Sequence, residues 1–275
     1  MTEPDRPAAV RRLLTSVGID ATTLAAAVTA DGLPVYGVRV ETARAAELWR
    51  RLRARHGRTG LLPFLSREGP ADWALSGEGA PRDPDRLAAA LARPPAEVVN
   101  ELITAQRAGS SEYTIPDQET TAYHLGLFDV AHTRELMDAD PAEGPWRRHS
   151  EFGGVSRDPR WLCLVPARAS FELPVLLDAP HASDWHASRA HPRLTEADHV
   201  GVLRSWQERF GAEIRYLGPV ALGLVVAEPP TRPAELARVA VEQFAYCDDL
   251  DQFIGEPHRV AQLQVPTDRW YFWWD

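Results

Sequence analysis

The sequence contains no lysine, and this absence excludes several kinds of chemistry. All 30 residues in the combined lysine and arginine count are arginine, in a chain of 275 residues. The chain therefore has no lysine for a Schiff base, for the attachment of pyridoxal phosphate or for a phosphate-binding loop. Its two cysteines, Cys163 and Cys247, are too few for a disulfide framework and lack the spacing of a zinc ribbon or a thioredoxin motif.

Signals for export, membrane insertion and common catalytic templates are missing as well. The first residues lack the charged and apolar regions of a signal peptide, and no apolar run approaches the roughly 18 residues of a membrane span. There is no GxSxG elbow, no HExxH helix and no Rossmann glycine fingerprint after a strand. We therefore expect a cytoplasmic protein that has no membrane partner and belongs to none of the familiar catalytic classes.

Charge is distributed unevenly along the chain. The formal net charge is −9, but residues 1–70 hold 11 arginines against seven acidic residues, a net charge of +4. Residues 71–275 carry the remaining excess of acid. An acidic protein of this kind does not attract the phosphate backbone, so no nucleic-acid partner is expected.

The chain ends in five consecutive aromatic residues, Trp270 to Trp274, followed by Asp275. Such a run must be buried, because exposed aromatic side chains at a free end would remain in water. Aromatic residues alternate on both faces of the predicted strand, which indicates cover on both sides. We expect the tail to lie against its own helices and against the N-terminal half of the protein.

The first 138 residues predict an α/β half with one strand-helix-strand unit. Strands are expected at 34–40 and 60–65, joined by a helix from Thr42 to His56, and such a unit normally makes a parallel pair. The other elements expected in this half are helices at 8–17, 21–30, 84–93 and 96–107 and a strand at 121–128. Residues 139–160, rich in proline, glycine and charge, are the predicted linker.

Residues 161–275 predict a second domain. A buried strand at 161–166 is followed by a helix that Thr195 caps and Gly211 ends, a hairpin at 213–226, a helix at 231–247 and the aromatic strand. This βαββαβ order is typical of ferredoxin-like sandwiches. The predicted fold is therefore α/β (α+β), with the N-terminal half packed on a C-terminal ferredoxin-like sandwich.

Four ordered segments of the C-terminal domain resemble one bacterial family. They are residues 202–212, Pro229-Pro230, residues 242–247 and the aromatic terminus, while residues 59–63 resemble the N-terminal half of longer members. On these segments the chain is similar, over roughly residues 160–275, to the bacterial domain of unknown function 4253, common in actinobacteria. The resemblance implies a domain boundary and a fold. Where members have Cys-Pro-Asp, this chain has Cys247-Asp248-Asp249, which departs from the pattern.

That segment is also the first candidate site. If the helix ends near Cys247, then Asp248, Asp249 and Asp251 lie at its negative end, where anions are unfavourable. A divalent cation could compensate, and so could pairing with Arg259 or Arg269. Cys247 itself is a possible nucleophile, but neighbouring acids raise a thiol pKa, which favours a buried structural cysteine instead.

The second candidate is a loop rich in histidine. His181, Asp184, His186 and His191, followed by His199, offer enough ligands for zinc or a similar metal. The alternative is a surface loop without a ligand. No other cofactor is expected.

A third candidate is an arginine pair on the helix that begins at Thr42. Arg51 and Arg55 share one helix face, which could receive an acidic partner or a phosphate group. The alternative is that they pair with the acidic residues of the protein itself.

Three functions are compatible with these features. The first is a non-catalytic binding or interaction protein that neutralises or scaffolds a protein partner through the surface around 247–257. The second is an enzyme of unfamiliar type, possibly metal-assisted, in which Asp248, Asp249 and the histidine loop line a cleft between the halves. The third is a sensor that binds a small molecule between the halves.

Overall fold

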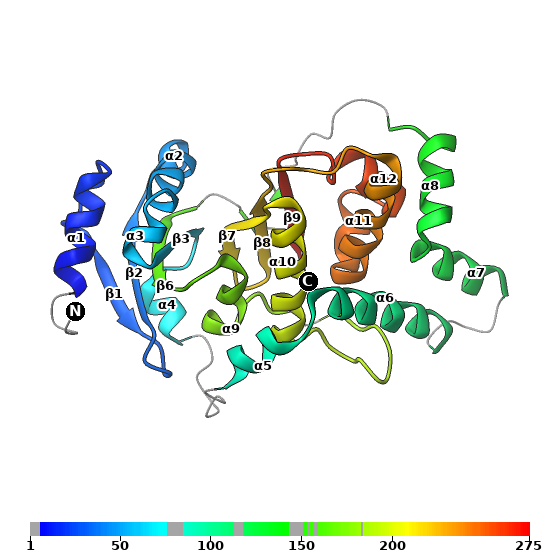
Figure 1. Ribbon diagram of the computed structural model, residues 1–275, viewed down its shortest axis with the longest axis horizontal. Coiled ribbons are helices and arrows are strands. Elements are labelled where there is room, and N and C mark those ends of the chain that lie inside the picture. Colours follow the sequence, from blue (N-terminus) through cyan, green and yellow to red (C-terminus); the bar gives the residue numbers. More distant parts are fainter. Residues whose placement is uncertain are drawn as a thin grey trace.

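The protein is built around one mixed sheet of seven strands (Figure 1). A computed structural model describes residues 6–75, 85–112, 118–142, 151–152, 155–156, 159–182 and 184–275. The predicted α/β class is confirmed. In spatial order the strands are β1 (Ala25–Val28), β2 (Pro34–Arg39), β6 (Trp161–Pro166), β3 (Leu61–Ser66), β7 (Glu213–Gly218), β8 (Ala221–Val225) and β9 (Arg269–Trp273).

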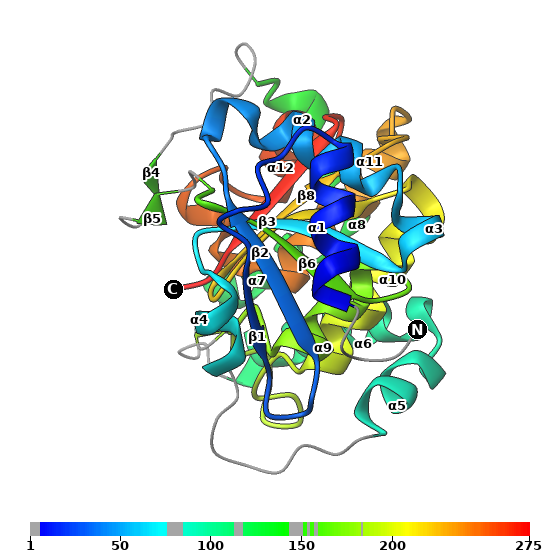
Figure 2. The same ribbon diagram turned by 90° about the vertical axis from the view of Figure 1, so that its left-hand side faces the viewer.

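Helices surround this sheet. In Figure 1, α7, α8, α11 and α12 lie on the side of β9 that faces away from the N-terminus. Figure 2 views the opposite end, where α1 and the β1–β2 hairpin face the viewer. A small hairpin, β4 (Glu151–Phe152) and β5 (Val155–Ser156), stands apart from the main sheet. The helices are α1 (Arg6–Ser16), α2 (Thr42–Arg53), α3 (His56–Thr59), α4 (Pro70–Leu75), α5 (Arg86–Ala92), α6 (Pro95–Glu112), α7 (Gln118–Leu127), α8 (Val130–Ala139), η2 (Ser170–Glu172), α9 (Leu173–Leu177), α10 (Glu196–Phe210), α11 (Pro233–Tyr246), η3 (Asp248–Gln252) and α12 (Pro257–Leu263).

Strand β3 lies between two strands of the C-terminal domain. It pairs antiparallel with β6 on one side and parallel with β7 on the other. In a ferredoxin-like sandwich, β6 would pair with strands of the C-terminal domain. Its neighbours on the two sides are instead β2 and β3, so the predicted ferredoxin-like strand pairing is wrong. The physical reason is that β3 is buried from Leu62 to Ser66, and a strand buried on both faces belongs in the centre of a sheet. Strands β2 and β3 do run parallel, but β6 lies between them.

The pairing of β3 with β7 is short, and Pro63 explains why. Proline has no N–H to donate to a neighbouring strand, and the β3–β7 register is confined to Leu65 and Tyr216. The carbonyl of Pro63 instead accepts a hydrogen bond of 2.9 Å from the Trp49 indole of α2. The helix thereby satisfies a backbone group in the middle of the sheet.

Two predicted elements have the wrong type. Residues 21–30 contain strand β1 (Ala25–Val28) rather than a helix, because Asp31-Gly32 makes a hairpin turn in which Gly32 has a φ of 80°. This turn signal outweighs the helix propensity of the alanine run.

Residues 121–128 fall largely in helix α7 rather than in a strand, because its packing against α6 and α8 overrides the preference of its threonines for strands. The predicted linker 139–160 lies mostly outside the described residues, and the division into two domains stays a prediction.

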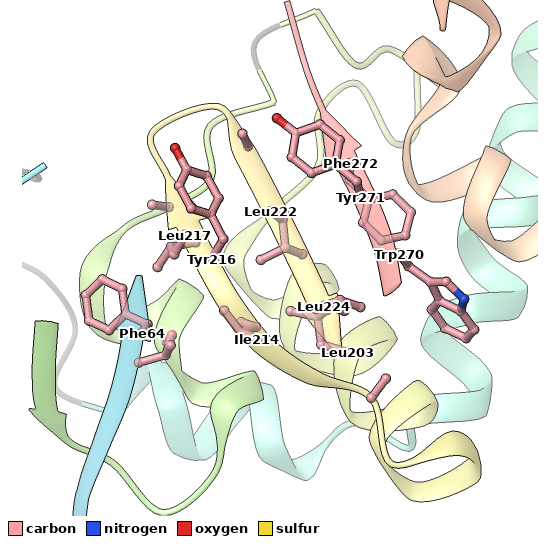
Figure 3. Close-up of a cluster of buried hydrophobic side chains, with 14 of the residues drawn as sticks. Phe64, Leu203, Ile214, Tyr216, Leu217, Leu222, Leu224, Trp270, Tyr271 and Phe272 are labelled. Atoms are coloured by element: carbon pink, nitrogen blue, oxygen red, sulfur yellow. The ribbon is translucent and has the colours of Figure 1, made fainter. Parts of the chain in front are cut away.

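The aromatic tail is buried, as predicted, and one of its faces forms the aromatic centre of the core. Trp206 of α10 stacks on Phe272 at a centroid distance of 5.3 Å and an interplanar angle of 16°. It also meets the edges of Trp270 and Tyr246. Figure 3 shows the apolar side chains of β7, β8 and β9 beside Leu203 of α10. On the opposite face, Tyr271 contacts Phe253.

Strand β9 is an edge strand, and side chains cover its outer backbone groups. The Tyr271 N–H donates to the side-chain carbonyl of Gln264 at 3.0 Å. The Cys247 thiol donates to the Trp273 carbonyl at 3.1 Å, and the Thr267 hydroxyl donates to the Arg269 carbonyl at 2.7 Å. These bonds occupy an edge that would otherwise pair with another chain. The ring contacts of the tail with Trp206 and Phe253 come from the C-terminal half, and contact of the tail with the N-terminal half stays a prediction.

Replacing Trp206 tests this aromatic centre. We expect Trp206→Ala to lower the free energy of unfolding by about 3–5 kcal/mol, because loss of a fully buried indole leaves a cavity and removes one hydrogen bond of the buried Glu242 carboxylate, which keeps its pairing with Arg209. Urea denaturation followed by circular dichroism measures the change. The control is Leu75→Ala, an exposed apolar residue whose loss should cost no more than about 0.5 kcal/mol. Equal effects of the two substitutions would contradict the assignment.

Candidate functional site

A pocket of about 850 Å³ lies where α5 meets the N-terminal end of α10. Figure 1 shows α5 beside the lower end of α10. One wall comes from α5 in the N-terminal half, and the others come from the loop after α9 and from the first turn of α10. The ionisable side chains that line the pocket are Arg86, Arg93, Asp178, His181, Arg193, Glu196 and His199.

Asp198 holds these walls together. Its side chain is 1% exposed and accepts hydrogen bonds from the Thr195 amide at 2.9 Å and the Thr195 hydroxyl at 2.6 Å, which confirms the predicted helix cap. Arg93 from the N-terminal half donates to the same carboxylate at 2.9 Å, and His191 lies 3.1 Å from it. Burial raises the pKa of Asp198, but the hydrogen bonds from Thr195 and Arg93 outweigh it, and the pKa lies below its ordinary value. Asp198 is therefore a charged carboxylate that joins both halves.

The arginines of the pocket differ in their partners. Arg86 pairs with Asp31 at 2.8 Å and lies 3.8 Å from Glu196. Arg93 pairs with Glu101 and Asp198. Arg193 is exposed and its side chain has neither a hydrogen bond nor an ion pair in the part of the chain that the structure describes. One cationic group in the pocket is thus available to a ligand.

His199 lies in the wall of the pocket as a neutral imidazole. It is 2% exposed, and its Nδ1 lies 2.6 Å from the Tyr246 hydroxyl. Burial lowers the pKa of His199 to about 4, and burial also raises the pKa of Tyr246 well above its usual value. Both groups are uncharged at neutral pH, so neither has the pKa near 7 that suits a general acid or base.

The structure does not bring the four predicted metal ligands together. His181 lines the pocket, Asp184 is exposed, the His186 ring contacts the Pro192 carbonyl at 2.8 Å, and His191 faces Asp198. Among the described residues, no group of three or more histidine, cysteine or acidic side chains is placed to hold a metal ion. The loop instead serves to build the pocket and to complete the contacts of Asp198.

The predicted acidic cluster lies on η3, directly after α11, and does not line this pocket. The two arginines proposed as its partners are engaged elsewhere, Arg259 with Asp140 and Arg269 with Asp268. Burial, together with Asp249 and Asp251, raises the pKa of Asp248 to about 7. A proton on Asp248 therefore reduces the repulsion among the three carboxylates. In the sequence analysis, a bound cation was one way to reduce the same repulsion.

Cys247 has a structural role. It is fully buried, its thiol donates to the Trp273 carbonyl, and burial raises its pKa well above the ordinary value. A thiol held in this form is a poor nucleophile. Burial likewise raises the pKa of Cys163.

Arg51 and Arg55 connect two helices. Arg51 donates to the Val17 carbonyl at 3.2 Å and pairs with Glu47, while Arg55 donates to the Ser16 carbonyl at 3.4 Å. Carbonyls at the end of a helix lack intrahelical donors. Arg51 on α2 and Arg55 just after it therefore satisfy carbonyls at the C-terminal end of α1. The pair thus has a structural use in the protein itself.

Comparison with known proteins identifies the C-terminal part of the chain. Residues 161–275 match the family described as "Domain of unknown function (DUF4253)", which agrees with the resemblance in the sequence. Neither a curated protein nor a solved structure matches the chain. Within the described residues, no helix combines the length and apolar character needed to cross a membrane.

The pocket arginines Arg86, Arg93 and Arg193 were not identified from the sequence. They come together only because α5 packs against α10, about a hundred residues further along the chain. The one local signal was the Thr195–Asp198 cap, which marks the helix end but not what faces it.

The raised pKa of Asp248 predicts a pH dependence of stability. In the unfolded chain this carboxyl ionises near its ordinary value of 3.8, whereas the folded protein keeps the proton up to about pH 7. The folded state binds more protons in this window, so stability falls as pH rises from about 4 to 7. We expect Asp248→Asn to match the wild type near pH 4 and to exceed it at pH 8 by on the order of 2 kcal/mol.

Urea denaturation at a series of pH values measures this difference. The control is Asp268→Asn, which changes an exposed aspartate directly before β9. The difference in stability between Asp248→Asn and the wild type should change with pH. If it does not, Asp248 ionises normally in the folded protein.

Proposed function

We propose that this is a cytoplasmic, non-catalytic bacterial binding protein, of actinobacterial origin, whose ligand is a small anionic molecule. The pocket between α5 and α10 is the proposed site. The observation that carries the proposal is the convergence of Arg86, Arg93 and Arg193 on one pocket built from both halves.

The charges of the pocket favour an anion. Three arginines line it, against the two acidic residues Asp178 and Glu196. The first turn of α10 also lines it, and this helix of 15 residues directs its positive end there, next to the Thr195–Asp198 cap. Helix N-termini of this kind favour phosphate and carboxylate groups. Arg193, which has no ion pair within the described residues, supplies the charge that a ligand would neutralise.

The state of the reactive groups argues against catalysis. His199 and Tyr246 are neutral and bond to each other, and the Cys247 thiol is buried in a backbone contact. Asp248 and Asp249 do not line the pocket that His181 lines, so these residues do not share the cleft that the enzyme hypothesis requires.

The surface argues for a small molecule rather than a protein partner. In the segment 247–257, which was considered as a protein-binding surface, Leu250 and Phe253 are buried. The large apolar residues found exposed in the described part of the chain, Val28, Leu75 and Tyr123, lie on three separate helices and strands. Protein interfaces usually offer a contiguous apolar centre, and the buried Leu250 and Phe253 cannot supply one in the segment 247–257.

The position of the pocket fits a sensor. Its walls belong to α5 in the N-terminal half and to α10 in the C-terminal half, and Arg93 and Asp198 already join them. A ligand that contacts both walls binds the assembled protein and not the unfolded chain, so it stabilises the contact between the halves.

Thermal unfolding tests this proposal. We expect at least one of inorganic phosphate, succinate and citrate to raise the melting temperature in a saturable way, because each presents anionic oxygens to the arginines. Arg193→Gln should reduce the shift and weaken apparent binding roughly tenfold or more, the effect of losing a charged hydrogen bond. Differential scanning calorimetry in a buffer with a cationic acid and a neutral base, with titration of each anion at constant ionic strength, measures both.

The matched control is Arg44→Gln, which removes the same charge from an exposed position on α2 outside the pocket. Its ligand-induced shift should equal that of the wild type. The proposal fails if no anion raises the melting temperature, or if both arginine variants reduce the shift equally, which would indicate general screening of charge.

A further inference from the structure

A second pocket, of about 480 Å³, lies between α1 and the sheet at the other end of the protein. Its walls come from α1, from the start of β2, from the turn between α3 and β3, and from the end of β6. It does not share a residue with the pocket at α10. The apolar part of its lining consists of Ala9, Val10, Leu13, Pro34, Leu61 and Pro166.

Tyr36 gives this apolar pocket a polar group. Its side chain lines the pocket and the residue is only 4% exposed. Its hydroxyl has no hydrogen-bond partner within the residues that the structure describes. The hydroxyl is not among the buried side-chain atoms that lack a partner, so it reaches the open space of the pocket and is available to a bound molecule.

Two arginines complete the lining, and no acidic residue accompanies them among the residues that the structure describes. Arg6 of α1 and Arg58 of α3 are exposed, and neither guanidinium has an ion pair in the described part of the chain. Apart from Pro166, the lining comes from residues 1–70, the segment with a net charge of +4 in a protein whose total charge is −9.

The turn that carries Arg58 is held rigidly. Gly60 has a φ of 65°, a left-handed conformation that favours glycine, and a Cβ placed there would meet no atom within 4 Å. The Thr59 hydroxyl donates to the Arg55 carbonyl at 3.1 Å and accepts from the Leu61 amide at 3.2 Å. The segment 59–63, noted in the sequence for its resemblance, therefore fixes one wall of the pocket.

We propose that this pocket is a second binding site, and that it takes a small organic carboxylate with an apolar body. The apolar lining fits the body of such a molecule, and the guanidinium groups fit a carboxylate, which arginine binds in a bidentate manner. Tyr36 supplies a further hydrogen bond. A volume of this size lies within the usual range of small-molecule sites.

Isothermal titration calorimetry of the full chain tests the proposal with benzoate as the probe. Benzamide, which has the same shape without the charge, should bind roughly tenfold or more weakly, because the charged hydrogen bond is lost. Arg58→Gln should weaken benzoate by a similar factor, and Tyr36→Phe by roughly three- to tenfold, since it removes only the hydroxyl. Hexanoate in place of benzoate extends the test to an aliphatic acid.

Two controls keep the result specific. Arg12→Gln removes an exposed arginine of α1 that does not line the pocket, and Arg44→Gln removes an exposed arginine of α2 that lines neither pocket; both should bind benzoate like the wild type. Unchanged melting temperatures would show that Arg58→Gln and Tyr36→Phe are folded. The proposal is overturned if neither acid binds, if benzamide binds as tightly as benzoate, or if Arg58→Gln and Arg12→Gln have the same affinity.

Discussion

Strand β3 comes from the first 70 residues, yet its hydrogen bonds hold the two ends of the sheet together. It joins β6, which carries β1 and β2 on its far side, to β7, which carries β8 and β9. Its residues from Leu62 to Ser66 are buried, so the strand contributes apolar surface to both faces. Without it, β6 and β7 would each present an unpaired edge in the middle of the core.

The other features of the protein depend on that arrangement. The sheet fixes the direction of α10, whose Trp206 packs on the tail and whose first turn meets α5. Asp198 then joins Arg93 to this turn, and the pocket of about 850 Å³ is the space that remains beside them. At the far edge of the sheet, Gln264, Thr267 and Cys247 occupy the outer groups of β9. A cysteine that suggested chemistry in the sequence thus completes a sheet edge.

The sequence predicts best where the controlling interactions are local. The Thr195–Asp198 cap and Gly211 fix the ends of α10, and the aromatic tail is buried as its composition requires. Strand order could not be predicted, because the insertion of β3 depends on contacts about 100 to 150 residues apart. The same limit applies to the site: Arg86, Arg93 and Arg193 converge only in the folded protein, while the conspicuous motifs at Cys247 and Arg51 satisfy backbone groups.

The most direct measurement is the folding of residues 161–275 alone, the segment that matches the family. If β3 is required between β6 and β7, this fragment should show no cooperative thermal transition and a poorly dispersed amide spectrum. Co-expression with residues 1–142 should restore both, because the missing strand is supplied in trans. A fragment that melts cooperatively and gives a dispersed spectrum on its own would contradict the account.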